Sequence, residues 1–274
     1  TADPSIADIL GWHEQGQTTS SALVAAYLDR IETYDKPHDG RPGLASVIAV
    51  NPEPLALPRT LDAERAAGRL RGPLHGVPIL IKDNIGTVDM PTTNGSVAFA
   101  TYRTHQDATV TRRLREAGAI IIAKANLSEF AWTSVNSESS LRGQARNPYD
   151  PSRTTTGSSG GSASAVAAGF APASLGSDTS GSIRNPANHQ ALVGLRPTHG
   201  LVSLAGVTAQ VSVMDTVGPM TRTVRDTALL LDVLAGSDPR DAYTADSDAH
   251  RPASYVGALR DDALQGAPIG VVTN

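Results

Sequence analysis

The sequence contains no cysteine among its 274 residues. This absence excludes disulfide bonds, thiolate metal sites and a cysteine nucleophile, although secreted and cytoplasmic enzymes can both lack the residue. Long hydrophobic runs are missing as well. The longest apolar stretch, residues 119–123, has the length of a strand, whereas a bilayer span needs about 20 residues. No signal-peptide pattern follows Thr1. We therefore expect no membrane partner, and the compartment stays open between cytoplasmic and secreted.

An excess of positive charge is also absent. The chain has 23 Lys and Arg against 27 Asp and Glu, which gives a formal net charge of −4. Nucleic-acid binding usually needs a basic surface, so we expect no nucleic-acid partner. The one basic cluster, formed by Arg112, Arg113 and Arg115, is typical of a solvated helix face. Hydrophobic residues make up 40% of the chain, which is enough for one large core or two modest ones.

Helices dominate the expected structure of residues 1–70, and strands alternate with helices over residues 71–236. The expected helices cover residues 6–13, 19–31, 61–67, 107–118, 160–169 and 224–235, with caps at Ser5, Thr19 or Ser20, Asp107 and Thr223. The expected strands cover residues 44–50, 76–81, 119–123, 171–176 and 269–272. Fully apolar strands between helices predict an α/β sheet covered on both faces.

Two serine clusters stand between these elements. Residues 157–161 match G-x-S-x-G with Ser159 at the centre, which is the nucleophile elbow of α/β-hydrolases. That elbow needs an apolar strand directly before it, and residues 151–156 are polar, so we reject this interpretation. The second cluster, residues 176–186, follows a strand candidate. Small residues before Ser182 let successive backbone N–H groups point at one spot, as an oxyanion hole requires.

The serine needs a base, and no histidine lies in either cluster; His189 is the nearest. Lys82 is a better candidate because it ends the apolar strand 77–81. Burial at a strand end can lower the pKa of a lysine, which leaves a neutral amine that accepts a proton. Serine–lysine catalysis is a known variant of the triad. From Lys82 alone, a surface lysine at a strand end remains the alternative.

Five sequence blocks together resemble the amidase signature family. They are Gly76-Val-Pro-Ile-Leu-Ile-Lys-Asp-Asn84, Lys124-Ala-Asn-Leu-Ser-Glu-Phe130, Gly157-Ser-Ser-Gly-Gly-Ser-Ala163, Ser177-Asp-Thr-Ser-Gly-Ser-Ile-Arg-Asn-Pro-Ala187 and Gly194-Leu-Arg-Pro-Thr-His-Gly200. The blocks occur in the family's order, and Ser158 and Ser182 are 24 residues apart (182 − 158), as in the family. The resemblance covers nearly the whole chain. It implies a mixed, twisted β-sheet covered by helices on both faces, and no metal or cofactor.

The resemblance also implies roles for individual residues. Lys82 matches the base, Ser158 the serine beside an unusual cis peptide bond, and Ser182 the nucleophile that forms the acyl-enzyme. The backbone N–H groups of the oxyanion hole match Thr179, Ser180, Gly181 and Ser182, and the pair that holds this loop matches Asp178 and Arg184. For Ser159 we expect a role in supporting the turn. We expect Lys82, Ser158 and Ser182 to form a hydrogen-bonded chain with spacings of about 2.6 to 3.2 Å.

Departures from the family pattern are small residues. Thr155 and Thr156 stand where the family usually has Pro-Gly, and Ala191 replaces a frequent glycine. Ser180 stands where glycine or aspartate is commoner. We expect the catalytic turn to tolerate these changes.

The resemblance favours a stand-alone amidase of the peptide-amidase type, acting on a small-molecule or peptide amide. The amidotransferase A-type subunit usually has Arg-Tyr-Gly after the corresponding Val-Ser, whereas this chain has Leu204-Ala-Gly206. That amidotransferase component, and a non-catalytic scaffold that kept the fold, remain the alternatives.

Family members are substantially longer than residues 1–274, which we interpret as a single amidase signature domain that is incomplete at its C-terminus. The remaining segment would be cleaved, truncated or present as a separate chain. The apolar segment 269–272 would then leave an open sheet edge in the isolated chain. We expect residues 1–274 to need that segment for a stable monomer.

Overall fold

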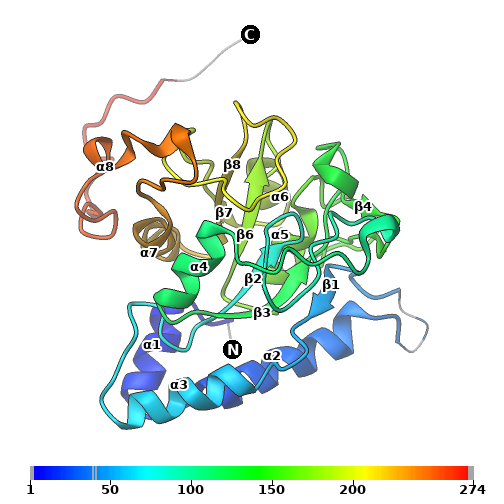
Figure 1. Cartoon of the computed structure of the whole chain (residues 1–274), viewed down its shortest axis with the longest axis horizontal. Coiled ribbons are helices and arrows are strands. Elements are labelled where there is room, and N and C mark those ends of the chain that lie inside the picture. The colour runs from blue at the N-terminus through cyan, green and yellow to red at the C-terminus, as the bar shows by residue number, and fades with distance from the viewer. Residues whose placement is uncertain (1–2, 39, 41, 271–274) are drawn as a thin grey trace.

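The computed structural model describes residues 3–38, 40 and 42–270, and three of its first four elements are helices. These are α1 (Ile6–Glu14), α2 (Ser20–Asp35) and α3 (Ala56–Ala66), which lie together at one end of the molecule (Figure 1). Ser5 caps α1 in a capping box with Asp8, and Thr19 caps α2 by accepting from the Ala22 N–H. The expected helices at residues 6–13 and 19–31 and their caps are thus confirmed.

A six-stranded sheet with the order β1-β3-β2-β6-β8-β7 forms the centre of the molecule. Its strands are β1 (Val47–Val50), β2 (Pro78–Lys82), β3 (Ile120–Ala125), β6 (Ala173–Asp178), β7 (Val193–Gly194) and β8 (Thr216–Thr221). Strand β2 runs parallel to β3 and β6, whereas the β1–β3, β6–β8 and β7–β8 pairs are antiparallel. Strands β4 (Glu138–Ser139) and β5 (Gly143–Gln144) form a separate pair. The sheet is mixed, as expected.

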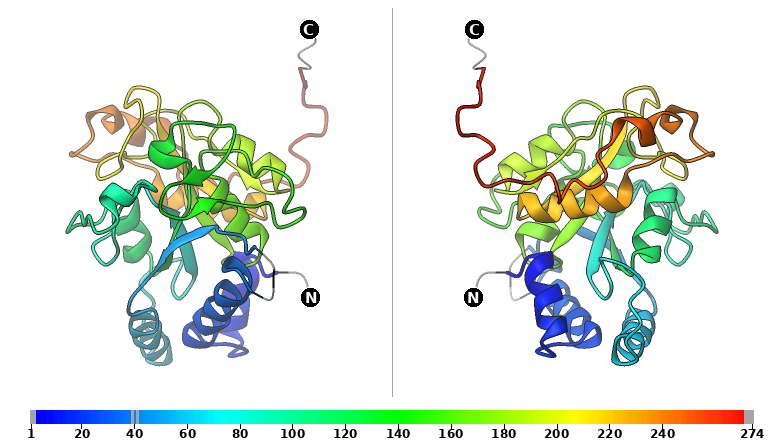
Figure 2. Two further views of the ribbon diagram at one scale, coloured as in Figure 1. Left: turned by 90° about the vertical axis from the view of Figure 1, so that its right-hand side faces the viewer. Right: turned by 90° about the vertical axis from the view of Figure 1, so that its left-hand side faces the viewer.

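Helices cover both faces of this sheet. Helix α5 (Gly160–Ala167) packs across the central strands, while α4 (Thr109–Glu116) and α7 (Val224–Leu234) pack together against β3 and β8 (Figure 2). Strands β2, β3, β6 and β8 are buried at every position, which requires cover on both sides. Short elements complete the described chain: η1 (Val97–Phe99), η2 (Glu129–Ala131), α6 (Arg184–His189), η3 (Ala242–Thr244) and α8 (Ser247–His250). The predicted α/β fold is confirmed.

The expected cap at Asp107 is wrong. Helix α4 begins at Thr109 without a side-chain cap. The Asp107 carboxylate instead accepts from the Val88 N–H at 2.9 Å and pairs with Arg115 at 3.0 Å. The prediction that Arg112, Arg113 and Arg115 form a solvated helix face is also wrong in part. Arg113 donates to the carbonyl groups of Leu234, Gly236 and Ser237. Both residues serve contacts between segments that are distant in sequence.

The C-terminal strand expected at 269–272 is not seen where the structure describes it. Residues 269 and 270 belong to no strand, and Ile269 is 72% exposed. Positions 271 and 272 lie outside the described residues. Over the described ranges, no helix combines the length and the hydropathy that a bilayer crossing requires.

Candidate active site

Three polar segments meet at one edge of the sheet. Strands β2 and β6 are parallel neighbours, so their carboxyl ends lie at the same edge, where open α/β sheets bind ligands. Lys82 is the last residue of β2, and Asp178 is the last residue of β6. The turn before α5 brings Ser158 to the same place.

Lys82 is fully buried, so it is not the surface lysine of the alternative interpretation. Its Nζ donates to Ser158 Oγ at 2.7 Å, to Ser177 Oγ at 2.9 Å and to the Ser177 carbonyl at 3.3 Å. Burial lowers the pKa of Lys82 to about 7, and the negative charges of Asp178 and Asp215 oppose this only in part. A large fraction of Lys82 is therefore neutral near pH 7 and can accept a proton.

A second buried lysine shows a different environment. Lys124 on β3 forms an ion pair with Asp83 at 3.3 Å, and both side chains have 0% exposure. Its Nζ also donates to the Ile85 carbonyl at 2.7 Å and to Thr92 Oγ1 at 3.0 Å. Burial lowers the pKa of Lys124, but the Asp83 carboxylate favours the charged form. Lys124 is therefore a structural cation, whereas the partners of Lys82 are hydroxyl and carbonyl groups.

Ser158 lies in a tightly packed turn. The Gly157–Ser158 peptide bond is cis. A side chain at Gly157 would meet the Asn136 carbonyl oxygen, because an added Cβ would lie 2.0 Å from it. The Ser158 carbonyl accepts from the Ser128 N–H and from Ser137 Oγ, each at 3.1 Å. These contacts fix the buried Ser158 hydroxyl against Lys82.

The Ser159 hydroxyl is already engaged with the backbone of β6. Its Oγ donates to the Ser177 carbonyl at 3.1 Å and accepts from the Ser177 N–H at 3.3 Å. No strand directly precedes Ser159, which agrees with the rejection of the nucleophile elbow. The position suits support of the turn rather than attack on a substrate.

Ser182 is brought next to this turn by the backbone. The Ser159 N–H donates to the Ser182 carbonyl at 3.2 Å, and the Ser182 residue is 4% exposed. Among the described residues, Ser182 Oγ makes no hydrogen bond. The structure thus contains the Lys82–Ser158 contact of the expected chain but not a Ser158–Ser182 hydrogen bond. The Ser182 hydroxyl is left without a competing partner.

The loop before Ser182 is organised by Asp178. Its carboxylate accepts from the N–H groups of Gly181 at 2.7 Å and Ile183 at 3.0 Å. It pairs with Arg184 at 3.2 Å and with Arg196 at 3.3 Å. Burial would raise the pKa of Asp178, but these hydrogen bonds, with that from Arg184 the largest, lower it.

The bond from Gly181 corrects the expected oxyanion hole. Its N–H is committed to Asp178 and does not point freely at a substrate. Within the described part of the chain, the N–H groups of Thr179, Ser180 and Ser182 make no hydrogen bond to protein. These three groups are the available donors.

Residues 22–274 match the family described as Amidase. The chain belongs to the amidase family. It is 47% identical over 247 residues to the A-type subunit of glutamyl-tRNA(Gln) amidotransferase from Gloeobacter violaceus, a match that covers 90% of this chain and 48% of that protein. The native peptide amidase of Stenotrophomonas maltophilia is 44% identical with a TM-score of 0.84, over 89% of this chain and 50% of that one. An amidase family protein from Bacillus anthracis gives a TM-score of 0.90 at 38% identity, over 96% of this chain and 52% of that one. The chain therefore spans about half the length of the relatives it matches.

Four residues around the site of this amidase-family chain were not predicted from the sequence. Ser177 and Asn84 stand inside the blocks that carry the resemblance, yet only contacts show that they surround Lys82. Arg196 pairs with Asp178, and Asp215 accepts from Thr179 Oγ1 and from the Gln210 N–H. The first two could have been found as polar residues beside Lys82 and Asp178. Asp215 lies in no recognisable motif.

Two of the departures from the family pattern keep a backbone conformation that glycine favours. Thr156 and Ala191 both have a φ of 54°, in the left-handed region. Such a φ is a genuine outlier for a β-branched residue. The surrounding turn holds Thr156 in this conformation through the Thr154 Oγ1 that accepts from its N–H at 2.9 Å. The turn before Ser158 thus accommodates the larger side chain.

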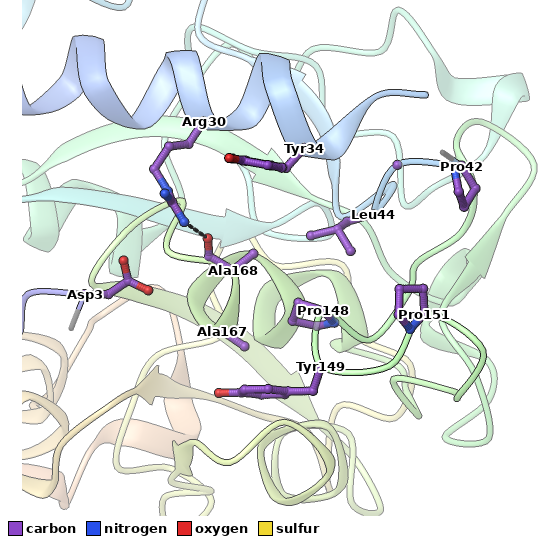
Figure 3. A pocket seen from close by; sticks show the side chains of 11 residues that line it. Asp3, Arg30, Tyr34, Pro42, Leu44, Pro148, Tyr149, Pro151, Ala167 and Ala168 are labelled. Carbon is purple, nitrogen blue, oxygen red and sulfur yellow. Dashed lines mark hydrogen bonds between the residues drawn. The ribbon is translucent and has the colours of Figure 1, made fainter. Parts of the chain in front are cut away.

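A well-formed cavity of about 470 Å³ lies away from these residues. Figure 3 shows Tyr34 and Tyr149 on its walls and Arg30 donating to the Ala168 carbonyl at 2.8 Å. None of the candidate catalytic residues lines it. No group of three or more potential metal ligands occurs in the part of the chain that the structure describes.

Proposed function

We propose that this chain carries the catalytic residues of a serine amidase, which hydrolyses a linear carboxamide to an acid and ammonia or an amine. The observation that carries the proposal is the buried Lys82 amine, 2.7 Å from Ser158 Oγ, in a site where the Ser182 hydroxyl has no hydrogen-bond partner among the described residues. A lysine without a carboxylate partner in its ion-pair range can act as a neutral base. The family membership supports the reaction class.

The proposed reaction begins with a proton relay. Lys82 takes the proton of Ser158 as Ser158 takes the proton of Ser182, and Ser182 Oγ attacks the amide carbon. The N–H groups of Thr179, Ser180 and Ser182 stabilise the negative oxygen of the tetrahedral intermediate. Reversal of the relay protonates the leaving nitrogen, and the C–N bond breaks. Water then repeats the sequence on the acyl-enzyme. Attack requires Ser182 Oγ to turn toward Ser158, as catalytic hydrogen bonds often form only with substrate present.

Activity should increase as Lys82 loses its proton. Because the base must be neutral, kcat/KM should rise with pH through the Lys82 pKa of about 7 and fall on its acid side. A pH–rate profile with a small amide measures this limb. An acid limb near pH 4, the range of an unperturbed carboxylic acid, would point to a carboxylate base instead.

Within the reaction class, we favour a stand-alone hydrolase that resembles the peptide amidase. A panel of peptide amides, aryl amides, fatty amides and free carboxamides would identify the substrate class. The amidotransferase component is the second candidate, because that is the name of several relatives at 44–47% identity. For that candidate, activity should depend on tRNA and on a partner chain.

A non-catalytic scaffold is the third candidate, and labelling by a fluorophosphonate serine probe separates it from the two enzymes. We expect the probe to form a covalent adduct on Ser182, located by mass spectrometry of peptides. A chain that does not label above pH 7 in the full-length protein would be a scaffold.

We further propose that a segment corresponding to the uncovered half of the relatives covers the rim of this site. Trp132, Val135 and Val213 are 80%, 73% and 60% exposed. The Trp132 carbonyl accepts from Gln210, which also contacts Thr179, so these loops flank the proposed oxyanion donors. Exposed apolar groups of this kind usually mark a covered surface.

An isolated 1–274 chain should therefore self-associate, and adding the remaining segment as a separate chain should reverse this. Size-exclusion chromatography measures the association. A monodisperse, active monomer of residues 1–274 would contradict the proposal.

A further inference from the structure

Two of the three acceptors around the Lys82 amine come from one residue, Ser177. Its Oγ lies 2.9 Å from Nζ, and its carbonyl oxygen lies 3.3 Å from it. Ser158 Oγ at 2.7 Å is the third. No other residue in the described part of the chain contributes two groups to the amine.

We propose that Ser177, oriented by Asn84, is a positioning residue that holds the Lys82 amine against Ser158 and accepts its N–H bonds after it has taken up the proton. The proposal rests on the proposed Ser-Ser-Lys function.

The donor count of the amine explains the need for two acceptors on Ser177. A neutral amine has two N–H bonds and one lone pair. The lone pair accepts the Ser158 proton, so a new N–H bond forms as the Ser158 O–H bond breaks. The N–H bonds already present donate to Ser177 Oγ and to the Ser177 carbonyl. The lone pair can then point only at Ser158, and the ammonium has an acceptor for each of its three N–H bonds.

Asn84 fixes the Ser177 hydroxyl in the accepting role. Its Nδ2 donates to Ser177 Oγ at 3.0 Å and to the Thr208 carbonyl at 3.1 Å. A carbonyl only accepts, so the amide cannot be flipped without losing that bond. Asn84 therefore presents an N–H to Ser177 rather than its oxygen, and it is only 2% exposed.

Ser159 holds the backbone of the same residue. Its hydroxyl bonds to both the N–H and the carbonyl of Ser177, at 3.3 and 3.1 Å. The Ser177 groups are thus fixed at the side chain by Asn84 and at the main chain by Ser159. Preorganised acceptors need no rearrangement when charge appears on the amine.

Removing the Ser177 hydroxyl should destabilise the ammonium form of Lys82. In the full-length protein, Ser177→Ala should move the acid limb of kcat/KM to lower pH by about one unit. The ammonium loses one hydrogen bond, and the free energy of a hydrogen bond to a charged group is similar to that of one pKa unit. It should also lower kcat about tenfold, because the amine is less well aimed at Ser158. The charged groups that face Lys82, Asp178 and Asp215, are unchanged in this variant, and Asp83 remains paired with Lys124.

Ser174→Ala is the matched control. Ser174 is a fully buried serine on the same strand, and among the residues that the structure describes its hydroxyl bonds only to the adjacent Leu175 carbonyl, at 3.4 Å. This control should leave the acid limb in place. Ser177→Thr, which keeps the hydroxyl, should restore the wild-type limb.

Asn84→Asp serves as a second variant if Ser177→Ala does not fold. Its carboxylate accepts from Ser177 instead of donating and places a negative charge near the amine, so the limb should move to higher pH. An unchanged limb in a folded Ser177→Ala, or in Asn84→Asp, would overturn the proposal.

A titration of Lys82 by nitrogen NMR, with the signal assigned by its loss in Lys82→Met, separates this inference from the proposed function. If the Lys82 titration shifts in Ser177→Ala but activity survives Lys82→Met, the contact between Ser177 and Lys82 is supported and the proposed mechanism is rejected. An unshifted titration would reject the inference whatever the activity.

Discussion

Replacing Ser182 by alanine is expected to abolish acyl-enzyme formation and to lower kcat/KM by about 10⁴-fold or more. The reason is chemical, because the Ser182 hydroxyl is the only proposed attacking oxygen and no protein group can substitute for it. Its Oγ makes no hydrogen bond among the described residues, so the substitution removes no hydrogen bond from the fold. Stopped-flow measurement of the acyl-enzyme burst with an activated amide or ester gives the readout. Thermal melting should remain at the wild-type temperature.

Ser159→Ala provides the comparison for Ser182→Ala. Its hydroxyl links the turn to β6 through two bonds to Ser177, so its loss should reduce activity less and stability more. A buried hydroxyl with two partners is expected to contribute about 1–3 kcal/mol. Equal losses of activity in the two variants would revive the nucleophile-elbow interpretation, in which Ser159 attacks.

Local signals in the sequence were sufficient for much of the fold. Ser5, Thr19 and Thr223 each cap the helix that follows, because a capping side chain bonds only two or three residues along the chain. Asp107 failed as a cap, since the distant Val88 N–H and Arg115 compete for its carboxylate. Strand β8 was not predicted at all. It contains Gly218 and Pro219, which weaken a strand pattern, yet it lies between β6 and β7.

The residues of the candidate site likewise include some that the sequence predicts and some that it does not. The blocks around Lys82 and Ser158 predicted residues that the fold brings to 2.7 Å, although they are 76 positions apart. The Gly181 N–H, which we expected to be an oxyanion donor, bonds to the Asp178 carboxylate instead, and that bond forms only in the folded loop. Asp215 could not be predicted, since its contacts with Thr179 and Gln210 depend on how two loops meet. Contacts between segments that are distant in sequence carry no signal in local side-chain patterns.

Substitution of the two buried lysines should separate catalysis from stability. Lys82→Met is expected to lower kcat/KM by about 10³-fold or more while the protein stays folded, because no ion pair is broken. Lys124→Met should instead lower the free energy of unfolding by about 3–5 kcal/mol, because it leaves the fully buried Asp83 carboxylate unpaired. Thermal melting and initial rates on the same preparations measure both effects.

The double variant Lys82→Met with Ser158→Ala adds a test of the relay. If Lys82 acts through Ser158, the second substitution should cost little more activity than the first, since the two residues move one proton as a unit. Independent roles would instead multiply the two losses. If Lys82→Met melts several degrees lower and loses activity only in proportion to the loss of folded protein, Lys82 would have a structural role like that of Lys124. The hydrogen-bond partners of Lys82, two serine hydroxyls and a carbonyl, carry no charge, and they predict the catalytic outcome.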